Sequence, residues 1–132
     1  MKKIICLIFC VLFTMNSQAG KRNCGYRDYF HLSDKVPPEI SIVSAESDYY
    51  MHIQILDPTQ FIIFDGVRCL SGRAVVVVAS EDRTKKCTLE IYDGPNDYHP
   101  HIEAACTSGL QYKGMHYDGF LSYSYTLDFE RS

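Results

Sequence analysis

The stretch from Leu121 to Phe129, LSYSYTLDF, decides the fold class of this chain. Its odd-numbered positions are all leucine, tyrosine or phenylalanine, and its even-numbered positions are serine, threonine or aspartate. Because successive side chains of a β-strand point to opposite faces, this alternation predicts a strand with one buried face and one wet face. Such strands are typical of antiparallel sheets, so the stretch favours an all-β fold.

The segment before it predicts a β-hairpin. Residues 86–92 alternate between polar and apolar side chains, and residues 101–106 form a second short strand. Between them lies DGPNDYHP, residues 93–100, which is rich in the residues that form turns. In the simplest antiparallel register, Tyr92 lies opposite His101.

Other short apolar stretches, separated by turn residues, complete the pattern. Four valines in succession, Val75 to Val78, predict a central strand that is buried on both faces. No stretch shows the 3.6-residue period of an amphipathic helix. We therefore predict a small antiparallel β-sandwich or barrel of about seven short strands. The remaining strands are expected near residues 39–44, 49–56 and 60–64.

The first nineteen residues have the composition of a secretory signal peptide. Lys2 and Lys3 provide a positive start, and residues 4–15 form an apolar run too short for an ordinary transmembrane helix. Ser17 and Ala19 then fit the small residues that signal peptidase requires. We expect cleavage after Ala19, and a periplasmic or secreted protein with no stable membrane anchor.

The chain after the signal peptide, residues 20–132, is expected to form a single β domain. Its first part, residues 20–38, is polar and ends in Val36-Pro37-Pro38. Two prolines in succession exclude a helix and favour extended backbone. This part is therefore predicted to be an irregular N-terminal arm.

The balance of charge narrows the range of partners. Thirteen basic and sixteen acidic residues give a net charge of −3, and removal of Lys2 and Lys3 with the signal peptide would make it −5. An acidic chain argues against nucleic acids and anionic membrane surfaces as partners. A basic protein partner is compatible with this charge, although acidic surfaces also serve solubility alone.

The cysteines predict two disulfides. An even number of cysteines in a short exported chain is typical of a disulfide framework, and their wide spacing does not fit a zinc site. In a hairpin with Tyr92 opposite His101, Cys87 lies opposite Cys106 at a separation that suits a disulfide. That pairing leaves Cys24 and Cys69 for the second bridge. The four cysteines after the signal peptide are Cys24, Cys69, Cys87 and Cys106.

No catalytic motif is present. The chain lacks the G-x-S-x-G motif of many serine hydrolases, and paired cysteines leave no free thiol as a nucleophile. We therefore expect a protein that is not an enzyme and needs no cofactor. His99 and His101 are weak candidates for a metal site, because their loop also contains Asp93 and Asp97. The same loop composition is, however, that of an ordinary long β-turn.

Tyrosine is the most unusual part of the composition, with ten tyrosines and no tryptophan. Tyr98, Tyr112 and Tyr117 lie in predicted loops, where tyrosine supplies rigid contact area at a small entropic cost. They are expected either to bind a partner or to cover exposed edges of the core. Tyr123 and Tyr125 share the apolar stripe of the last strand and are predicted to be core residues.

These features favour a non-enzymatic binding protein that contacts or inhibits a protein partner, in the manner of an immunity protein. A rigid scaffold would present the protruding loop of residues 93–101 to a cleft of that partner. The tip of this loop and the 107–119 loop are expected at opposite ends of the domain, unless the second loop folds back. The candidate contact residues are Asp93, Asn96, Asp97, Tyr98, His99, Tyr112 and Tyr117.

Two alternatives stay open. The first is a carbohydrate or small-ligand binding module, or an adhesin-type subunit, that uses the loop tyrosines. The second is a metal-binding protein that uses residues 93–101.

Overall fold

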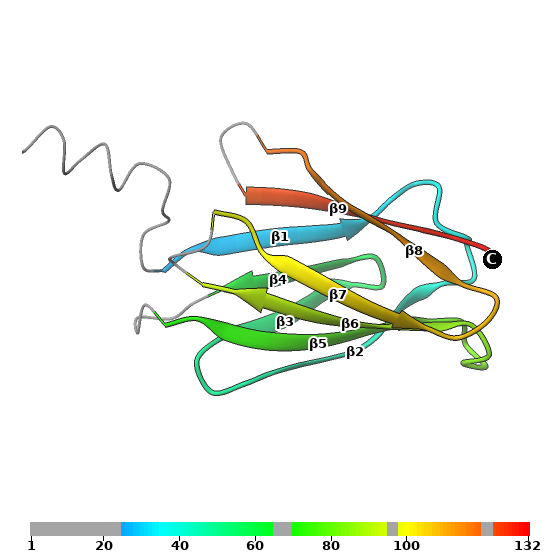
Figure 1. The fold of residues 1–132 in the computed structure, drawn as a ribbon, viewed down its shortest axis with the longest axis horizontal. Coiled ribbons are helices and arrows are strands. Elements are labelled where there is room, and N and C mark those ends of the chain that lie inside the picture. The colour runs from blue at the N-terminus through cyan, green and yellow to red at the C-terminus, as the bar shows by residue number, and fades with distance from the viewer. Residues whose placement is uncertain (1–24, 65–69, 95–97, 120–122) are drawn as a thin grey trace, which may run out of the picture.

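The computed structural model describes residues 25–64, 70–94, 98–119 and 123–132, and these contain nine β-strands and no helix. One sheet has the strand order β3-β4-β1-β9-β8, and the other has the order β2-β5-β6-β7 (Figure 1). Within the described residues there is accordingly no helix that could span a membrane. The strands are β1 (Arg27–Leu32), β2 (Ser41–Ser47), β3 (His52–Asp57), β4 (Gln60–Phe64), β5 (Gly72–Ala79), β6 (Lys86–Asp93), β7 (His101–Cys106), β8 (Gln111–Tyr117) and β9 (Tyr123–Glu130).

The two sheets pack face to face over a shared apolar core. In β9 the core-facing residues Tyr125, Leu127 and Phe129 are fully buried, and Tyr123 is partly buried against the same core. In β6 the core-facing residues Leu89 and Ile91 are also fully buried, while the intervening residues are half-buried. Residues of both sheets belong to one hydrophobic cluster, so the all-β prediction is confirmed as a two-layer sandwich.

An aromatic stack crosses the centre of the larger sheet. β1 lies between β4, to which it is antiparallel, and β9, to which it is parallel. Phe30 of β1 is in register with Phe61 and Tyr125, and its ring centroid lies 4.7 Å and 5.2 Å from theirs. The parallel pair shows that the predicted purely antiparallel arrangement was wrong for this sheet.

The structure contains more strands than the predicted seven. β1 lies within the segment 20–38 that was predicted to be irregular, and β8 lies within a predicted loop. The alternation of β1 is obscured in the sequence because Asp28 occupies an inward position, where it is fully buried. β8 is an edge strand whose residues are half-buried or exposed, so it lacks a strong apolar stripe.

The four valines lie on the interior strand β5, as expected, but only one face of that strand is fully buried. Val76 and Val78 are buried, whereas Val75 and Val77 are half-buried. In a two-layer sandwich the outer face of a sheet meets solvent, unlike a parallel sheet with helices on both faces. The prediction of burial on both faces was therefore wrong.

The disulfide Cys87–Cys106 joins β6 and β7 and confirms one of the two predicted bridges. The register places Tyr92 opposite His101 and Cys87 opposite Cys106, as the sequence predicted. Cys24 and Cys69, the predicted second pair, lie outside the described residues, as does the predicted signal peptide.

Candidate functional site

A cluster of aromatic rings joins the two sheets at one end of the sandwich. His99, in the connection between β6 and β7, has its Nδ1 atom 2.9 Å from the hydroxyl oxygen of Tyr125 in β9. The His99 ring centroid also lies 4.6 Å from that of Tyr117 in β8 and 4.7 Å from that of Tyr98. His99, in a connection of the smaller sheet, thus contacts two rings of the larger sheet and the neighbouring ring of Tyr98.

The strand register explains why these rings meet. Tyr117 and Tyr125 are directly opposite on the antiparallel pair β8–β9, so their rings share one face, with centroids 5.4 Å apart. On the other sheet, β6 ends and β7 begins at this end of the sandwich (Figure 1). His99 in their connection contacts both rings. Gly94 begins this connection, and its backbone lies so close to Ser71 that a β-carbon there would clash.

The rings of the cluster range from fully buried to exposed. Tyr125 is fully buried and His99 is half-buried, whereas Tyr98 is 59% exposed and Tyr117 is 44% exposed. The inner ring therefore anchors the outer rings, which stand in solvent. Tyrosines whose positions are already fixed by packing lose little conformational entropy when a partner covers them.

A polar contact on the outer face of the larger sheet fixes the chain just after Tyr117. The hydroxyl of Thr126 donates a hydrogen bond to Asp118, and it also lies 2.8 Å from Nε2 of His31. The carboxylate oxygen of Asp118 is 3.7 Å from the same nitrogen. Asp118 also donates its backbone N–H to the carbonyl of Ser124 at 2.9 Å. These contacts fix the backbone of the residue that follows Tyr117.

The candidate residues of the 93–101 loop have different environments. Asp93 is only 1% exposed, so its side chain lies beneath the surface. Its Oδ1 accepts a hydrogen bond of 2.9 Å from the backbone N–H of Gly94. Asn96 and Asp97 lie outside the described residues. Of this loop, Tyr98 and His99 therefore form the described contact surface.

Tyr112, a further candidate, is separated from this cluster. It lies near the start of β8, whereas Tyr117 ends that strand, and its ring packs on Phe129 at 5.3 Å between centroids. Burial raises the pKa of the Tyr112 hydroxyl to about 12. Tyr112 therefore belongs with the packing of the sandwich rather than with the exposed tyrosines.

The two candidate metal ligands have different contacts. His99 contacts Tyr125 and Tyr117, whereas the His101 ring centroid lies 6.1 Å from that of Tyr92, and His101 lies 3.5 Å from a carboxylate oxygen of Glu103. Among the described residues, no three histidine, cysteine, aspartate or glutamate side chains are grouped to hold an ion. The described part of the loop thus offers no metal-ligand set.

A second pair of tyrosines, not predicted as contact residues, lies at the same end of the sandwich. Tyr49 and Tyr50 lie between β2 and β3, are 72% and 42% exposed, and pack edge to face at 5.5 Å. We call this end, which carries Tyr49, Tyr50, Tyr98 and Tyr117, the aromatic end. The signal in the sequence was the Tyr-Tyr pair directly after Asp48, because aspartate favours turns.

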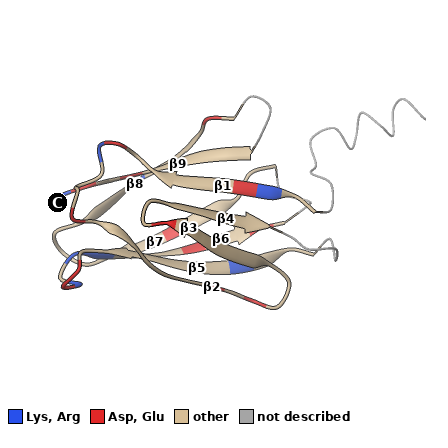
Figure 2. Ribbon diagram, turned by 180° about the vertical axis from the view of Figure 1, so that it is seen from behind, with Lys and Arg blue, Asp and Glu red and all other residues tan. Residues whose placement is uncertain are grey.

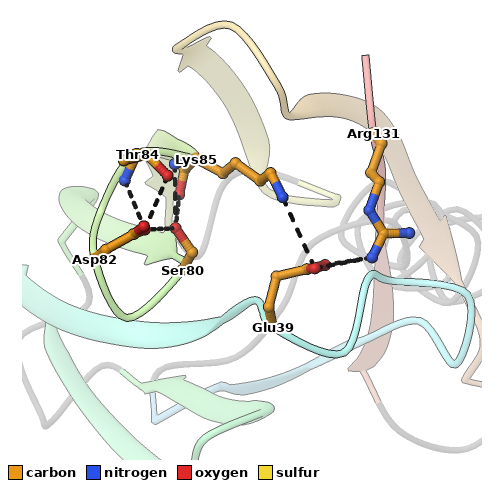
Figure 3. A network of polar contacts seen from close by, with 6 residues as sticks. All are labelled: Glu39, Ser80, Asp82, Thr84, Lys85 and Arg131. Atoms are coloured by element: carbon orange, nitrogen blue, oxygen red, sulfur yellow. Dashed lines mark hydrogen bonds and ion pairs between the residues drawn. The ribbon is translucent and has the colours of Figure 1, made fainter.

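The opposite end carries charged residues. Glu39 accepts hydrogen bonds of 2.7 and 2.8 Å from Nη2 of Arg131 and lies 3.8 Å from Nζ of Lys85 (Figure 3). The hydrogen bond from Arg131 lowers the pKa of the Glu39 carboxyl. Acidic and basic residues gather on the turns near the C-terminus (Figure 2). We call this end, defined by Glu39, Lys85 and Arg131, the charged end; its groups are paired with one another, so it suits a structural role.

The tight β5–β6 turn beside these residues is held by its own side chains. Asp82 accepts hydrogen bonds from the hydroxyls of Ser80 and Thr84, both at 2.8 Å (Figure 3). The bond from Ser80 is the main reason that the pKa of Asp82 lies below its usual value. These contacts close the turn, and the Asp82 carboxylate is used in hydrogen bonds within it.

Replacing Tyr125 by phenylalanine is expected to loosen the aromatic end without unfolding the protein. The variant keeps the buried ring but loses the hydrogen bond to His99, which costs about 1 kcal/mol of the free energy of unfolding. Hydrogen exchange should become faster at the amides of Tyr98 and His99. Tyr98→Phe, which removes a hydroxyl from an exposed ring, is the control and should change neither quantity. Unchanged exchange in Tyr125→Phe would show that the hydrogen bond does not hold this segment.

No known protein family, curated protein or solved structure matches this chain.

Proposed function

We propose that this protein is an exported, non-enzymatic binding protein whose aromatic end contacts and inhibits a protein partner. The observation that carries the proposal is the convergence of Tyr98 and Tyr117 around His99, on the buried support of Tyr125. Two segments that are distant in the sequence thereby present one surface of exposed, prearranged rings.

Physical reasons favour a protein partner for such a surface. Tyrosine is enriched among the residues that dominate protein interfaces, because its ring offers large apolar area and its hydroxyl offers a hydrogen bond. Rings that are already packed in the free protein reduce the entropic cost of binding. The contact residues that we assign are Tyr98, His99 and Tyr117, with Asp93 and Tyr112 left out because they are needed for packing.

The compartment and the charge are compatible with this role. The Cys87–Cys106 disulfide is consistent with an oxidising location outside the cytoplasm, which agrees with the predicted signal peptide. The net charge, −3 for the whole chain and −5 without Lys2 and Lys3, favours a partner with a basic surface around its binding site. An envelope enzyme or toxin with a basic cleft fits this chemistry.

The test is the loss of partner binding when the exposed rings are removed. Proteins from the envelope and secreted fractions would be captured on the disulfide-intact chain, identified, and titrated against the variant Tyr98→Ser/Tyr117→Ser. Interface residues of this kind contribute about 2 kcal/mol or more, so affinity should fall at least about 30-fold. Inhibition of an active partner should fall with it.

Tyr29→Ser is the matched control, because Tyr29 is 40% exposed but lies on the face of β1 opposite to the buried Phe30. It should leave affinity unchanged. Equal binding by wild type and the double variant would contradict the proposal. A glycan bound by wild type and lost in the double variant would replace it with the carbohydrate-binding alternative.

A further inference from the structure

One of the four edge strands differs from the others in its regularity. The larger sheet ends in β3 and β8, and the smaller sheet ends in β2 and β7. Bulges at an edge distort it and hinder pairing with another chain. β7 pairs with β6 along its whole length without a register shift. The other three edges have shifts at Ile42/Ser44 in β2, Ile55/Asp57 in β3 and Tyr112/Gly114 in β8.

β7 is also unusually open. Its sequence, HIEAAC, contains no lysine and no proline, and five of its six residues are exposed. Ala104 and Cys106 lie opposite the core residues Leu89 and Cys87, so they face the inner side of the sheet, yet they too are exposed. The other sheet therefore does not cover this part of β7, and its small side chains leave room for another strand.

The hydrogen-bond pattern shows which backbone groups face the open edge. Cys87 and Cys106 have Cα atoms 4.0 Å apart, as in the closely spaced, non-hydrogen-bonded pairs of antiparallel sheets. The next pair is hydrogen-bonded, since the N–H of Thr107 donates to the carbonyl of Lys86 at 2.8 Å. By this alternation, His101, Glu103 and Ala105 bond to β6. The N–H and C=O groups that point away from β6 are those of Ile102, Ala104 and Cys106.

We infer that β7 is a dimerisation strand, along which a second copy of this chain adds in antiparallel orientation with Ala104 opposite its own equivalent. A two-fold axis through this pair keeps the inner face of each sheet on the same side. Ala104 exchanges both hydrogen bonds with Ala104 of the second copy, and Ile102 does the same with Cys106 of the second copy. The two four-stranded sheets then become continuous.

The charges on β7 select this register. In it, Glu103 lies opposite Ala105 of the second copy, so the two carboxylates do not oppose each other. A register centred on Glu103 would place like charges directly opposite, which is destabilising. The edge is therefore self-complementary in the register centred on Ala104.

A contact along a six-residue strand is small, so the dimer should be weak and dependent on concentration. Sedimentation equilibrium of the disulfide-intact chain over a wide concentration series measures it. Wild type should shift from monomer to dimer, and no further, because an isologous pair closes on itself. A wild type that stays monomeric at millimolar concentration would overturn the inference.

Substitutions at Ala104 test the strand and its register. Ala104→Pro removes the central N–H, which does not bond to β6, so the fold should persist while dimerisation weakens about tenfold or more. Ala104→Lys keeps the N–H but places two cations opposite each other, and it should weaken the dimer as well. Ala104→Ser, small and uncharged, is the matched control and should dimerise like wild type.

If both Ala104→Pro and Ala104→Lys dimerise like wild type, β7 is not the interface. Circular dichroism and thermal unfolding verify that each variant is folded, and Ala104→Lys keeps the test decisive if proline prevents folding. The inference is independent of the proposed function, because it is read from dimerisation of Ala104 variants. The binding proposal is read from partner affinity of Tyr98 and Tyr117 variants.

Discussion

Replacing Phe30 by alanine is expected to lower the free energy of unfolding by about 3–5 kcal/mol, the usual cost of removing a buried aromatic ring. Phe30 is 1% exposed and its ring stacks between those of Phe61 and Tyr125. Its removal would leave a cavity lined by three strands, because β1 pairs with β4 on one side and with β9 on the other. Since a domain of this size is stable by about 5–15 kcal/mol in total, the variant should approach the limit of folding.

Urea unfolding followed by circular dichroism measures this loss. Tyr29→Ala is the matched control, because Tyr29 is the neighbouring residue on the opposite face of β1 and is 40% exposed. It should cost less than about 1 kcal/mol. Similar losses in both variants would mean that strand propensity, and not the aromatic stack, determines the contribution of β1.

Breaking the Cys87–Cys106 disulfide is expected to cost about 3 kcal/mol. The bridge closes a loop with a sequence separation of 19, and in the chain-entropy account it stabilises the protein by restricting the unfolded chain. Cys106→Ala tests this with little loss of packing, because Cys106 is exposed whereas Cys87 is fully buried. Thermal or urea unfolding of the oxidised proteins gives the difference.

Two further proteins separate the cross-link from packing. Cys87→Ala/Cys106→Ala removes a buried thiol in addition, so it should be somewhat less stable than Cys106→Ala. Ala105→Ser, an exposed neighbour on the same strand, should leave stability within about 0.5 kcal/mol of wild type. Wild-type stability in Cys106→Ala would mean that this bridge contributes nothing to the folded state.

The predictions that succeeded rest on local patterns. The alternation in residues 86–92, the turn after it and the two cysteines together fix one register, so Cys87 opposite Cys106 was predictable. The alternation of β9 likewise placed Tyr125 and Leu127 in the core. In both cases, neighbours along the chain carry the information, because side-chain direction in a strand has a period of two.

The predictions that failed depend on contacts between distant segments. β1 carries the inward-facing Asp28, and only its place between β4 and β9 makes it a strand of the sheet. β8 has weak alternation because it is an edge strand, and its regular partner β9 determines its conformation. Local sequence does not encode such pairings.

The candidate site shows the same division. The sequence singled out Tyr98, His99 and Tyr117 as candidates, but placed the hairpin tip and the 107–119 loop at opposite ends unless the second loop folds back. In the structure the second segment forms β8, which returns along the sandwich and brings Tyr117 to His99. The return depends on pairing with β9, so no property of residues 107–119 alone revealed it.

The sequence by itself determined the all-β class and the hairpin from Lys86 to Cys106 with its disulfide, and it singled out Tyr98 and Tyr117 as candidate contacts. The tertiary structure alone decided which of them meet, which are buried and which edge stays open. The physical reason is the sequence distance over which each kind of interaction acts. Strand periodicity and turn chemistry act between near neighbours, whereas sheet order and burial arise from packing between segments that are far apart in the chain.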